Sequence, residues 1–339
     1  MMASSAPVRR ACITGGAGFI GSNLADRLID AGSEVVVVDN FRTGRREFLA
    51  SILDHPRFSL VEGDVLEPGV LEPALTGCDW VFHLQANADV RRGFERPQWD
   101  LEQNTLATSR VLEAMRTAGV HRILFASSGS VYGEPAVFPT PEDAPFPQQT
   151  SLYGASKLAC EGLVAAYSAG FGLTGVVCRF VSILGERYTH GHVVDFYRQL
   201  RGDPDHLAVL GDGHQEKSYL YVGDCIDAML ACVARHADEP GTFVYNLGTD
   251  ETILVDESVR IITHHLGANP EVAHSGGIRG WIGDSPLILL DTSRIRELGW
   301  SPRVTISKAI ELTLDWLDDN EYAWHEQRSA PHRNRGPRR

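Results

Sequence analysis

Residues 14–21 read Thr-Gly-Gly-Ala-Gly-Phe-Ile-Gly, and they join a short apolar run at residues 10–14 to an amphipathic segment at residues 19–31. Glycines at positions 15, 18 and 21 allow a tight turn, a close approach of the backbone to a diphosphate and close packing of a helix on a strand. The backbone N–H groups at the start of such a helix attract a pyrophosphate. The stretch therefore predicts a strand–turn–helix unit that binds a dinucleotide.

The end of the second apolar run indicates which dinucleotide is bound. Asp39 follows four valines at residues 35–38, where a carboxylate accepts hydrogen bonds from a ribose 2′-hydroxyl and repels a 2′-phosphate. This favours NAD over NADP, and the nearby Arg42 weakens that preference without reversing it. Asp64 follows the third apolar run and is placed to reach the adenine, although an ordinary loop aspartate explains it nearly as well.

Short apolar runs alternate with longer amphipathic segments through residues 10–180. Strands are predicted at residues 10–14, 34–39, 58–61, 80–84, 122–127 and 174–180, because these runs are β-branched and nearly continuous. Continuous patterning indicates burial on both faces, as in parallel strands covered by helices. Helices are predicted at residues 19–31, 104–118 and 151–170, each followed closely by a glycine that would end it. The alternation predicts an α/β fold with a Rossmann-type, doubly wound parallel sheet.

The pattern loosens after residue 179. Glycine, proline and histidine are frequent in residues 185–213, and predicted helices follow at residues 223–237, 255–266 and 306–317, with a predicted strand at residues 242–247. We expect residues 8–178 to form an NAD-binding domain to which residues 223–249 return. Residues 179–222 and 250–325 would form a smaller mixed α/β substrate-binding lobe, and residues 326–339 a disordered basic tail.

The composition narrows the class of protein. The chain is 43% hydrophobic and 22% charged, as in soluble globular proteins, and its net charge of −13 argues against nucleic acid or an anionic membrane as the main partner. The six cysteines have no metal-binding spacing, which is typical of reduced core thiols and predicts neither a zinc site nor disulfides. The sequence has no apolar leader and no long apolar stretch, so we expect a cytoplasmic protein.

Tyr153 and Lys157 are candidates for acid–base chemistry. Four residues apart on a predicted helix, they share one face, so that the ammonium can lie beside the phenol. A unit charge about 4 Å away, at an effective dielectric of about 20, contributes roughly 4 kcal/mol, or about three pKa units. That would bring a phenol with a pKa of about 10 near neutrality. A Tyr-x-x-x-Lys pair is usually an ordinary surface feature, and the preceding glycine turn is what gives it weight.

These motifs together resemble the extended short-chain dehydrogenase/reductase superfamily, and within it the NAD-dependent nucleotide-sugar epimerase/dehydratase family. The resemblance covers almost the whole chain. The matching motifs are, in order, the glycine turn, Asp39-Asn40, Gly-Asp-Val at residues 63–65, Phe-His-Leu-Gln-Ala-Asn-Ala-Asp-Val at 82–90, Asn104, Ser-Ser-Gly-Ser-Val-Tyr-Gly at 127–133, Tyr153 with Lys157, Arg-Phe-Val-Ser at 179–182 and Gly-Asp-Gly at 211–213.

The resemblance implies a role for each matching residue. Ser128 would hydrogen-bond the sugar hydroxyl, Tyr153 would be the general base, and Lys157 would bind the nicotinamide ribose and lower the tyrosine pKa. The NAD site would comprise Gly15, Gly18, Phe19, Ile20, Asp39, Asn40, Asp64, Val65, Leu84, Ala86, Asn104, Ser127, Tyr153, Lys157 and Phe180. The substrate site would comprise Asp89, Ser127, Ser128, Ser130, Ser182, Arg187, His192, Lys217, Tyr219 and Arg279. No metal is implied.

The implied reaction is 4-epimerisation of a UDP-sugar through a transient 4-keto intermediate. The 4,6-dehydratases carry an Asp-Glu pair where this chain has Gly129 and Ser130, and the UDP-glucuronate decarboxylases carry a glutamate at the position of Ser130. Glycine and serine cannot transfer protons at a useful pKa. A dehydratase and a decarboxylase therefore rank behind an epimerase. A reductase is a further alternative, which would require the cofactor to exchange. A non-catalytic NAD-binding regulator ranks last, because all three implied catalytic residues are present.

The sugar stays open between a hexose, as in UDP-glucose and UDP-galactose, and a hexuronate, as in UDP-glucuronate and UDP-galacturonate. Ser182 stands where hexose epimerases have asparagine and hexuronate epimerases have a small hydroxyl residue. The arginine that hexuronate enzymes use for the carboxylate is missing; Arg187, His190 and His192 are candidates to replace it, with a polar loop that binds no ligand as the even alternative. Lys217 matches a diphosphate-binding residue, as does Arg279. The resemblance also implies a homodimer through helices 104–118 and 151–170.

Overall fold

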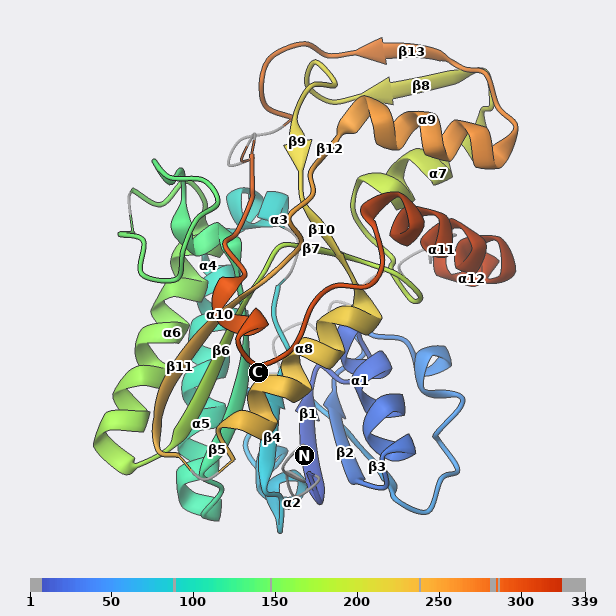
Figure 1. Cartoon of the computed structure of the whole chain (residues 1–339). Helices are drawn as coiled ribbons and strands as arrows, with labels where there is room; N and C mark the ends of the chain where they lie inside the picture. The colour runs from blue at the N-terminus through green and yellow to red at the C-terminus, as the bar shows by residue number, and fades with distance from the viewer. Residues whose placement is uncertain are drawn as a thin grey trace, which may run out of the picture.

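The computed structural model describes residues 8–87, 90–146, 148–237, 239–280, 285 and 287–324. A seven-stranded sheet lies at its centre, in the order β11-β6-β5-β4-β1-β2-β3, and every pair of neighbouring strands in it is parallel (Figure 1). The strands are β1 Arg10–Thr14, β2 Glu34–Asp39, β3 Phe58–Glu62, β4 Trp80–His83, β5 Arg122–Ser128, β6 Thr174–Phe180 and β11 Gly241–Leu247. The order reverses between β1 and β4, and ligands of such sheets bind beyond the carboxyl ends of the strands at this point.

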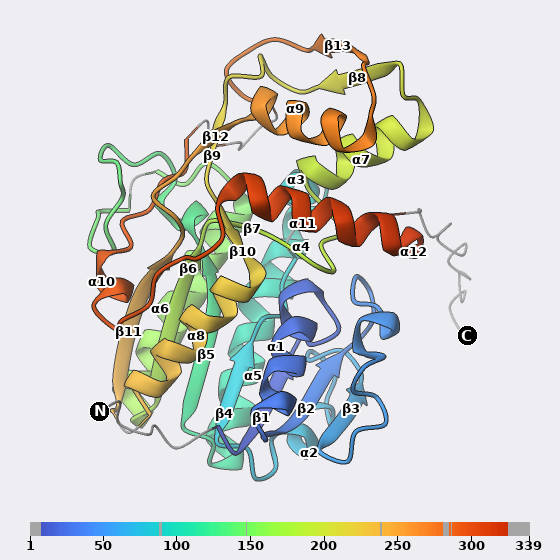
Figure 2. The same ribbon diagram turned by 45° about the vertical axis from the view of Figure 1, so that its right-hand side comes forward.

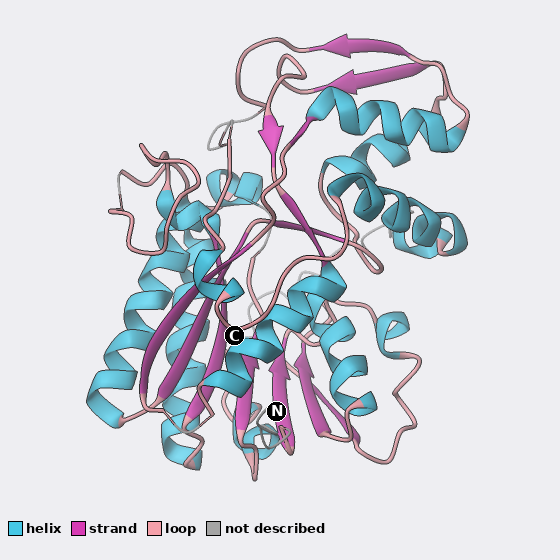
Figure 3. Cartoon of the chain, viewed as in Figure 1, coloured by secondary structure: helices cyan, strands magenta, loops and turns pink. Residues whose placement is uncertain are grey.

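Helices cover both faces of the sheet, which explains the continuous apolar patterning of its strands (Figure 3). Ala11 and Ile13 of β1 belong to the core on one face, where α1 (Phe19–Asp30) and α8 (Val222–Arg235) pack. Cys12 belongs to the core on the other face, where α2 (Leu71–Leu75), α5 (Ala107–Ala118) and α6 (Leu152–Phe171) pack. Because successive residues of a strand point to opposite faces, both sets have to be apolar.

A third apolar core lies beyond the carboxyl ends of the strands (Figures 1 and 2). It is formed by α7 (His192–Gly202), α9 (Val255–Leu266) and α11 (Ile306–Asp319), with β8 (His206–Val209) paired to β13 (Glu271–His274). Two short ladders lead to it: β7 (Ser182–Leu184) with β10 (Tyr219–Tyr221), and β9 (Glu216–Lys217) with β12 (Ile253–Leu254). The remaining short helices are α3 (Val90–Glu95), α4 (Pro97–Asp100), α10 (Ser293–Arg296) and α12 (Glu321–Trp324), with 3-10 turns at Arg46–Leu49 and Gly129–Tyr132.

The structure confirms the predicted Rossmann-type sheet. All six strands predicted within residues 10–180 are present, and the strand predicted at residues 242–247 joins the sheet edge as β11, beside β6. All six cysteines are buried free thiols, as predicted. No helix in the described part of the chain is long and apolar enough to cross a membrane. The predicted tail, residues 326–339, lies outside the described residues.

Two features differ from the prediction. Residues Leu101–Leu106 form a π-helix that leads into α5, where one helix over residues 104–118 is predicted. Helix α7 and strand β8 lie within residues 185–213, where no regular element is predicted. The apolar face of α7, with Val193, Tyr197 and Leu200 buried, is visible in the sequence. The glycine and histidine residues before it interrupt the pattern and hide its start.

Candidate active site

The glycine turn lies at the carboxyl end of β1, beside the reversal of strand order. Gly15 has a φ of +70°, and its N–H donates to the Val38 carbonyl at 2.8 Å. A Cβ at this position would lie 2.8 Å from the backbone of Gln85, and one at Gly21 would collide with the Gly15 carbonyl oxygen. Gly18 begins α1 without a side-chain cap. The turn is thus a cradle of bare backbone that any larger residue would fill, and it fits a diphosphate.

Asp39, at the end of β2, holds this turn in place. Its carboxylate accepts hydrogen bonds from the Ala17 N–H at 2.9 Å and from the Phe41 N–H at 2.8 Å. Burial raises the pKa of this carboxyl, and the two backbone hydrogen bonds act in the opposite direction. Each carboxylate oxygen has a further lone pair, which suits the hydroxyls of a ribose.

Asn40 and Asp64, both predicted to bind NAD, bind each other. Asn40 Nδ2 donates to Asp64 Oδ2 at 2.9 Å, and Asp64 Oδ1 accepts from the Leu66 N–H at 3.0 Å. The intervening Val65 is buried. The other predicted residues lie at the same carboxyl ends of the strands: Phe19 and Ile20 open α1, Leu84 and Ala86 follow β4, and Phe180 ends β6.

Ser128, Tyr153 and Lys157 meet at the end of β5. Ser128 is the last residue of that strand, and the first turn of α6 brings Tyr153 to it, with Lys157 one turn later. Burial raises the pKa of Tyr153 to about 12, and a hydrogen bond with Ser128 opposes that shift. The Ser130 N–H donates to Ser128 Oγ at 3.1 Å, and the Ser128 hydroxyl donates to Ser130 Oγ at 3.2 Å. Two hydroxyls and a phenol therefore lie together at the sheet edge.

Lys157 is almost wholly buried, and its ammonium donates to the Ala126 carbonyl at 2.8 Å. The ammonium lies 4.8 Å from the centre of the Phe125 ring and 5.9 Å from that of the Tyr153 ring. Burial lowers the pKa of Lys157 to about 8. The sequence predicts that this ammonium brings the phenol near neutrality. In the chain by itself that prediction is wrong, because burial raises the pKa of Tyr153.

Ser127 and Asn104 are predicted to contact NAD, and Ser127 also the substrate, but both side chains bind protein groups. Ser127 points to the opposite face of β5 from its neighbour, and its hydroxyl donates to Glu161. Asn104 is 1% exposed; its amide oxygen accepts from the Asn87 N–H at 2.8 Å and its nitrogen donates to Ser156 Oγ at 2.8 Å. These two side chains hold neighbouring protein segments, and their contact with NAD stays a prediction.

Four predicted substrate contacts form one polar cluster on β7, β9, β10 and α7. Tyr219 lies opposite Ser182 in the β10–β7 ladder, and its hydroxyl bonds His192 Nδ1 at 2.7 Å. Burial and the charge of Lys217 lower the pKa of His192 to about 3, so its imidazole is neutral. The Lys217 ammonium donates to the Ser285 carbonyl at 2.6 Å.

Arg187 and Arg279 are engaged in ion pairs. Arg187 adopts a φ of +71° and binds Asp26 of α1 at 2.5 Å. This pair attaches the β7–α7 connection to α1, and the role of Arg187 as a carboxylate partner stays a prediction. Arg279 binds Glu134 at 2.6 Å, at the surface. Asp89, also predicted to bind substrate, lies outside the described residues.

Three buried polar residues around the site are absent from the prediction. His83 lies between the hydroxyls of Thr14, at 2.6 Å, and Thr108, at 3.0 Å, and burial lowers its pKa to about 3. Glu161 and Arg179 form a buried ion pair. The signal that would have found this pair is a charged residue on the apolar face of a helix or strand, since such residues are rarely buried unless paired.

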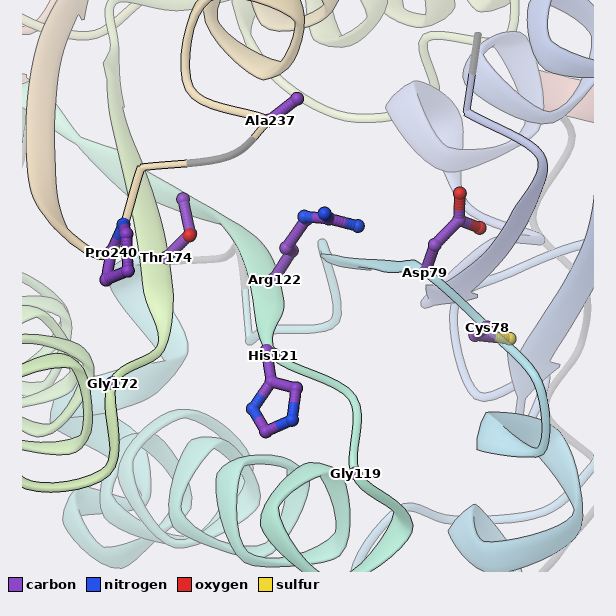
Figure 4. A pocket seen from close by; sticks show the side chains of 9 residues that line it. All are labelled: Cys78, Asp79, Gly119, His121, Arg122, Gly172, Thr174, Ala237 and Pro240. Carbon is purple, nitrogen blue, oxygen red and sulfur yellow. The ribbon is translucent and has the colours of Figure 1, made fainter. Parts of the chain in front are cut away.

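A surface pocket at the opposite end of the strands does not overlap this site. Figure 4 shows the side chains that line it: Cys78, Asp79, Gly119, His121, Arg122, Gly172, Thr174, Ala237 and Pro240. Arg122 and Thr174 are the first residues of β5 and β6, so the pocket lies at the amino ends of these strands. The glycine turn and Ser128 lie at the carboxyl ends, where dinucleotides bind.

The sequence and fold of this chain are similar to those of known proteins. A model of the NAD dependent epimerase/dehydratase family matches residues 11–248. A UDP-glucose 4-epimerase of Mycolicibacterium smegmatis is 33% identical over 319 residues, which cover 91% of this chain and 98% of that protein. A crystal structure of a UDP-galactose 4-epimerase is 36% identical, with a TM-score of 0.82 over 92% of this chain and 99% of that one. UDP-glucuronic acid decarboxylase 1 of Xenopus tropicalis is 30% identical over 91% of this chain and 72% of that protein.

The family match spans well over half of the chain and includes the glycine turn, Ser128, Tyr153 and Lys157. These relatives differ from one another in the reaction that their names give, so the reaction of this chain has to be argued from its own residues. The chain belongs to the NAD-dependent epimerase/dehydratase family of enzymes, and its cofactor is NAD.

Proposed function

We propose that the protein is an isomerase that inverts C4 of a UDP-hexose or a UDP-hexuronate through a transient 4-keto sugar. The observation that carries this proposal is the turn beside Tyr153, in which Ser128 and Ser130 supply hydroxyls and Gly129 supplies no side chain. A 4,6-dehydratase also has to move protons at C5 and C6, for which this turn offers no acid or base of useful pKa. Epimerisation requires only that the hydride leave C4 and return to the opposite face of the same carbon.

Tyr153 and Ser128 perform the proton transfer in this proposal. Tyr153 accepts the proton of the C4 hydroxyl as a phenolate, and Ser128, which hydrogen-bonds the phenol, orients that hydroxyl. NAD supplies the acceptor and donor of the C4 hydride, and the positive charge of its oxidised nicotinamide favours the phenolate. The buried Lys157 ammonium adds a second positive charge near the phenol. Both charges oppose the burial that raises the pKa of Tyr153, and proton return leaves no net oxidation.

The polar cluster of Ser182, His192, Lys217 and Tyr219 is proposed to bind the rest of the substrate. Lys217 would bind the diphosphate as a point charge, together with Arg279. Because Arg187 is paired with Asp26, a carboxylate at C6 would be held by hydrogen bonds from Ser182 and the neutral His192 and not by an arginine fork. Hydrogen-bonding groups of this kind suit a hydroxymethyl as well, so the site accommodates either sugar class.

A homodimer through α5 and α6 is proposed as well. Leu101 and Leu106 of the π-helix, and Phe171 at the end of α6, are large apolar side chains exposed on this side of the chain. Large apolar side chains exposed on these helices are available for a contact with a second copy. The division into an NAD-binding domain and a substrate-binding lobe, and a cytoplasmic location, stay predictions.

Proton NMR of the purified protein, incubated separately with UDP-glucose, UDP-glucuronate and UDP-N-acetylglucosamine and with no cofactor added, tests the proposal. Appearance of the C4 epimer from any of them would support it and identify the accepted groups at C2 and C6. A 4-keto-6-deoxy product would indicate a dehydratase, and a pentose with loss of carbon dioxide would indicate a decarboxylase. Unchanged substrates in the presence of bound NAD would contradict the proposal for all three sugars.

A further inference from the structure

A buried ion pair lies directly behind Ser128 and Lys157. Arg179 of β6 binds Glu161 of α6 through two contacts, Nε to Oε1 at 3.0 Å and Nη2 to Oε2 at 2.7 Å. The side chains of Arg179 and Glu161 are only 4% and 9% exposed. The Ser127 hydroxyl of β5 donates to Glu161 Oε1, and Ser127 is the register partner of Arg179 in the sheet. Three elements of the fold therefore meet at one carboxylate.

The remainder of the Arg179 guanidinium reaches the turn that follows Ser128. Its Nη1 donates to the Tyr132 hydroxyl at 2.6 Å and to the Glu142 carbonyl at 2.9 Å, and its central carbon lies 4.8 Å from the centre of the Tyr132 ring. Tyr132 ends the 3-10 turn Gly129–Tyr132, and its hydroxyl donates to Asn246 of β11 at 2.8 Å. The same arginine thus also fixes the turn that carries Ser130.

Stability alone does not account for this pair. Removing two charges from water costs about as much as their attraction returns, and well-packed apolar side chains in such places are often equally stable. A bidentate arginine–carboxylate pair provides what apolar side chains do not, because its two parallel hydrogen bonds fix one relative geometry. The elements whose geometry it fixes are those that carry Ser128, Ser130, Tyr153 and Lys157.

We propose that Glu161 is a positioning residue for the reaction: held by Arg179, it fixes Ser127, and through it Ser128, against the helix turns that carry Tyr153 and Lys157. Ser128 follows Ser127 directly, and Lys157 lies one turn before Glu161 on α6. Misplacing a reacting group by about 1 Å can cost about 10²-fold in rate, so the clamp formed by Arg179, Glu161 and Ser127 is expected to act on kcat. Only the rate effect rests on the proposed epimerisation; the effect on the Ser128 position does not.

Glu161→Gln tests the proposal, with Asp224→Asn as its matched control. Asp224 of α8 is 1% exposed. It accepts a hydrogen bond from the backbone N–H of Arg303 at 2.9 Å and forms an ion pair with the guanidinium of Arg303, so it too is a buried carboxylate bound to arginine. We expect Glu161→Gln to lower kcat by at least ~10-fold, with KM within ~3-fold and NAD still bound. Asp224→Asn should lose stability while its kcat stays within ~2-fold of the wild type.

Two variants of Ser127 cover the case in which Glu161→Gln does not fold. Ser127→Ala leaves the ion pair intact and removes only its link to β5, so we expect kcat to fall by ~3- to 10-fold. Ser127→Thr keeps the hydroxyl and should restore kcat. The proposal would be overturned if kcat were unchanged in these variants, or if only KM changed. It would also be overturned if Asp224→Asn lost as much kcat as they do.

Crystal structures provide a readout that does not depend on which reaction the enzyme performs. In Glu161→Gln, or in Ser127→Ala if the first does not fold, Ser128 Oγ should move away from the Tyr153 hydroxyl relative to the wild type. An unchanged Ser128 position would overturn the proposal even if the wild type is an epimerase. A moved Ser128 in an enzyme that makes no C4 epimer would support the clamp and contradict only the proposed function.

Discussion

The Lys157 ammonium lies 5.9 Å from the centre of the Tyr153 ring and gives its hydrogen bond to the Ala126 carbonyl at 2.8 Å, not to the phenol. The ammonium is therefore held near the tyrosine ring by a hydrogen bond to the backbone of β5. Burial lowers the pKa of Lys157 to about 8 and raises that of Tyr153 to about 12. At pH 7 the phenol is thus neutral while the ammonium is still mostly charged, and in the proposed mechanism the cationic nicotinamide supplies the further charge that a phenolate needs.

Tyr153→Phe should retain bound NAD and lose turnover by at least ~10²-fold, the usual scale for a missing general base. The aromatic ring is kept in this variant and only the hydroxyl is lost, so packing against Lys157 is preserved. The comparison requires kcat with the NAD content of each preparation measured by absorbance after denaturation. Activity within a few-fold of the wild type would remove Tyr153 from the mechanism.

Lys157→Met should abolish turnover and yet stabilise the NAD-free protein at pH 7. The pKa of Lys157 falls from 10.5 to about 8 on folding, so its burial opposes folding while it is protonated. The shift corresponds to roughly 3 kcal/mol, less about 1 kcal/mol for the lost hydrogen bond to Ala126. Urea unfolding should therefore give a gain of about 2 kcal/mol at pH 7.

The sign of this effect fixes its pH dependence. Between pH 8 and 10.5 the unfolded wild type binds more protons than the folded one, so the stability of the wild type rises through this window and the advantage of Lys157→Met shrinks. Lys308→Met is the control, because Lys308 is a half-exposed lysine whose replacement should change stability by less than about 0.5 kcal/mol at any pH. A Lys157→Met variant less stable than the wild type at pH 7 would refute the desolvation argument.

Asp39→Asn and Asp39→Ala should separate the two roles of this carboxylate. Asparagine keeps a carbonyl oxygen for one of the backbone N–H groups of Ala17 and Phe41 but carries no charge to repel a 2′-phosphate. We expect Asp39→Asn to narrow the preference for NAD over NADP by ~10-fold, and Asp39→Ala also to weaken both cofactors because the glycine turn loses its support. Calorimetric Kd values for the two dinucleotides decide the matter, and an unchanged ratio in both variants would exclude Asp39 from the ribose site.

Lys217→Met and Arg187→Ala form a matched pair for the substrate site. Lys217 lies in the polar cluster with His192 and Tyr219, so its loss should raise KM by ~10-fold through the missing diphosphate charge. Arg187 is paired with Asp26 on α1, so Arg187→Ala should leave KM within ~2-fold. A large KM effect of Arg187→Ala with UDP-glucuronate would show instead that the arginine leaves Asp26 to bind the sugar.

The sheet and the glycine turn are predictable from the sequence because their signals are local. The strand at residues 10–14, the glycines after it and Asp39 at the end of the second strand all follow from short-range patterning, and the structure places them as expected. Tyr153 and Lys157 share a helix face for the same reason.

The contacts that sequence reasoning misses join residues far apart in the chain. Arg187 binds Asp26, which lies 161 residues away in the sequence, and His83 binds Thr14, which lies 69 residues away. The direction of the Tyr153 pKa shift is also not local, because it depends on how much protein surrounds the phenol. The Ser127 hydroxyl is likewise directed to Glu161, 34 residues away, which its motif does not reveal.

The most direct test of the proposed chemistry uses a substrate deuterated at C4, chosen from whichever of the three UDP-sugars reacts, with deuterium NMR of the product and of the water. If oxidation and reduction occur at C4 on one tightly held NAD, the epimer should keep essentially all of its deuterium at C4, and none should appear in solvent. Deuterium released to water, or solvent hydrogen incorporated at C4, would show that C4–H cleavage proceeds by proton transfer and would contradict the transient 4-keto route.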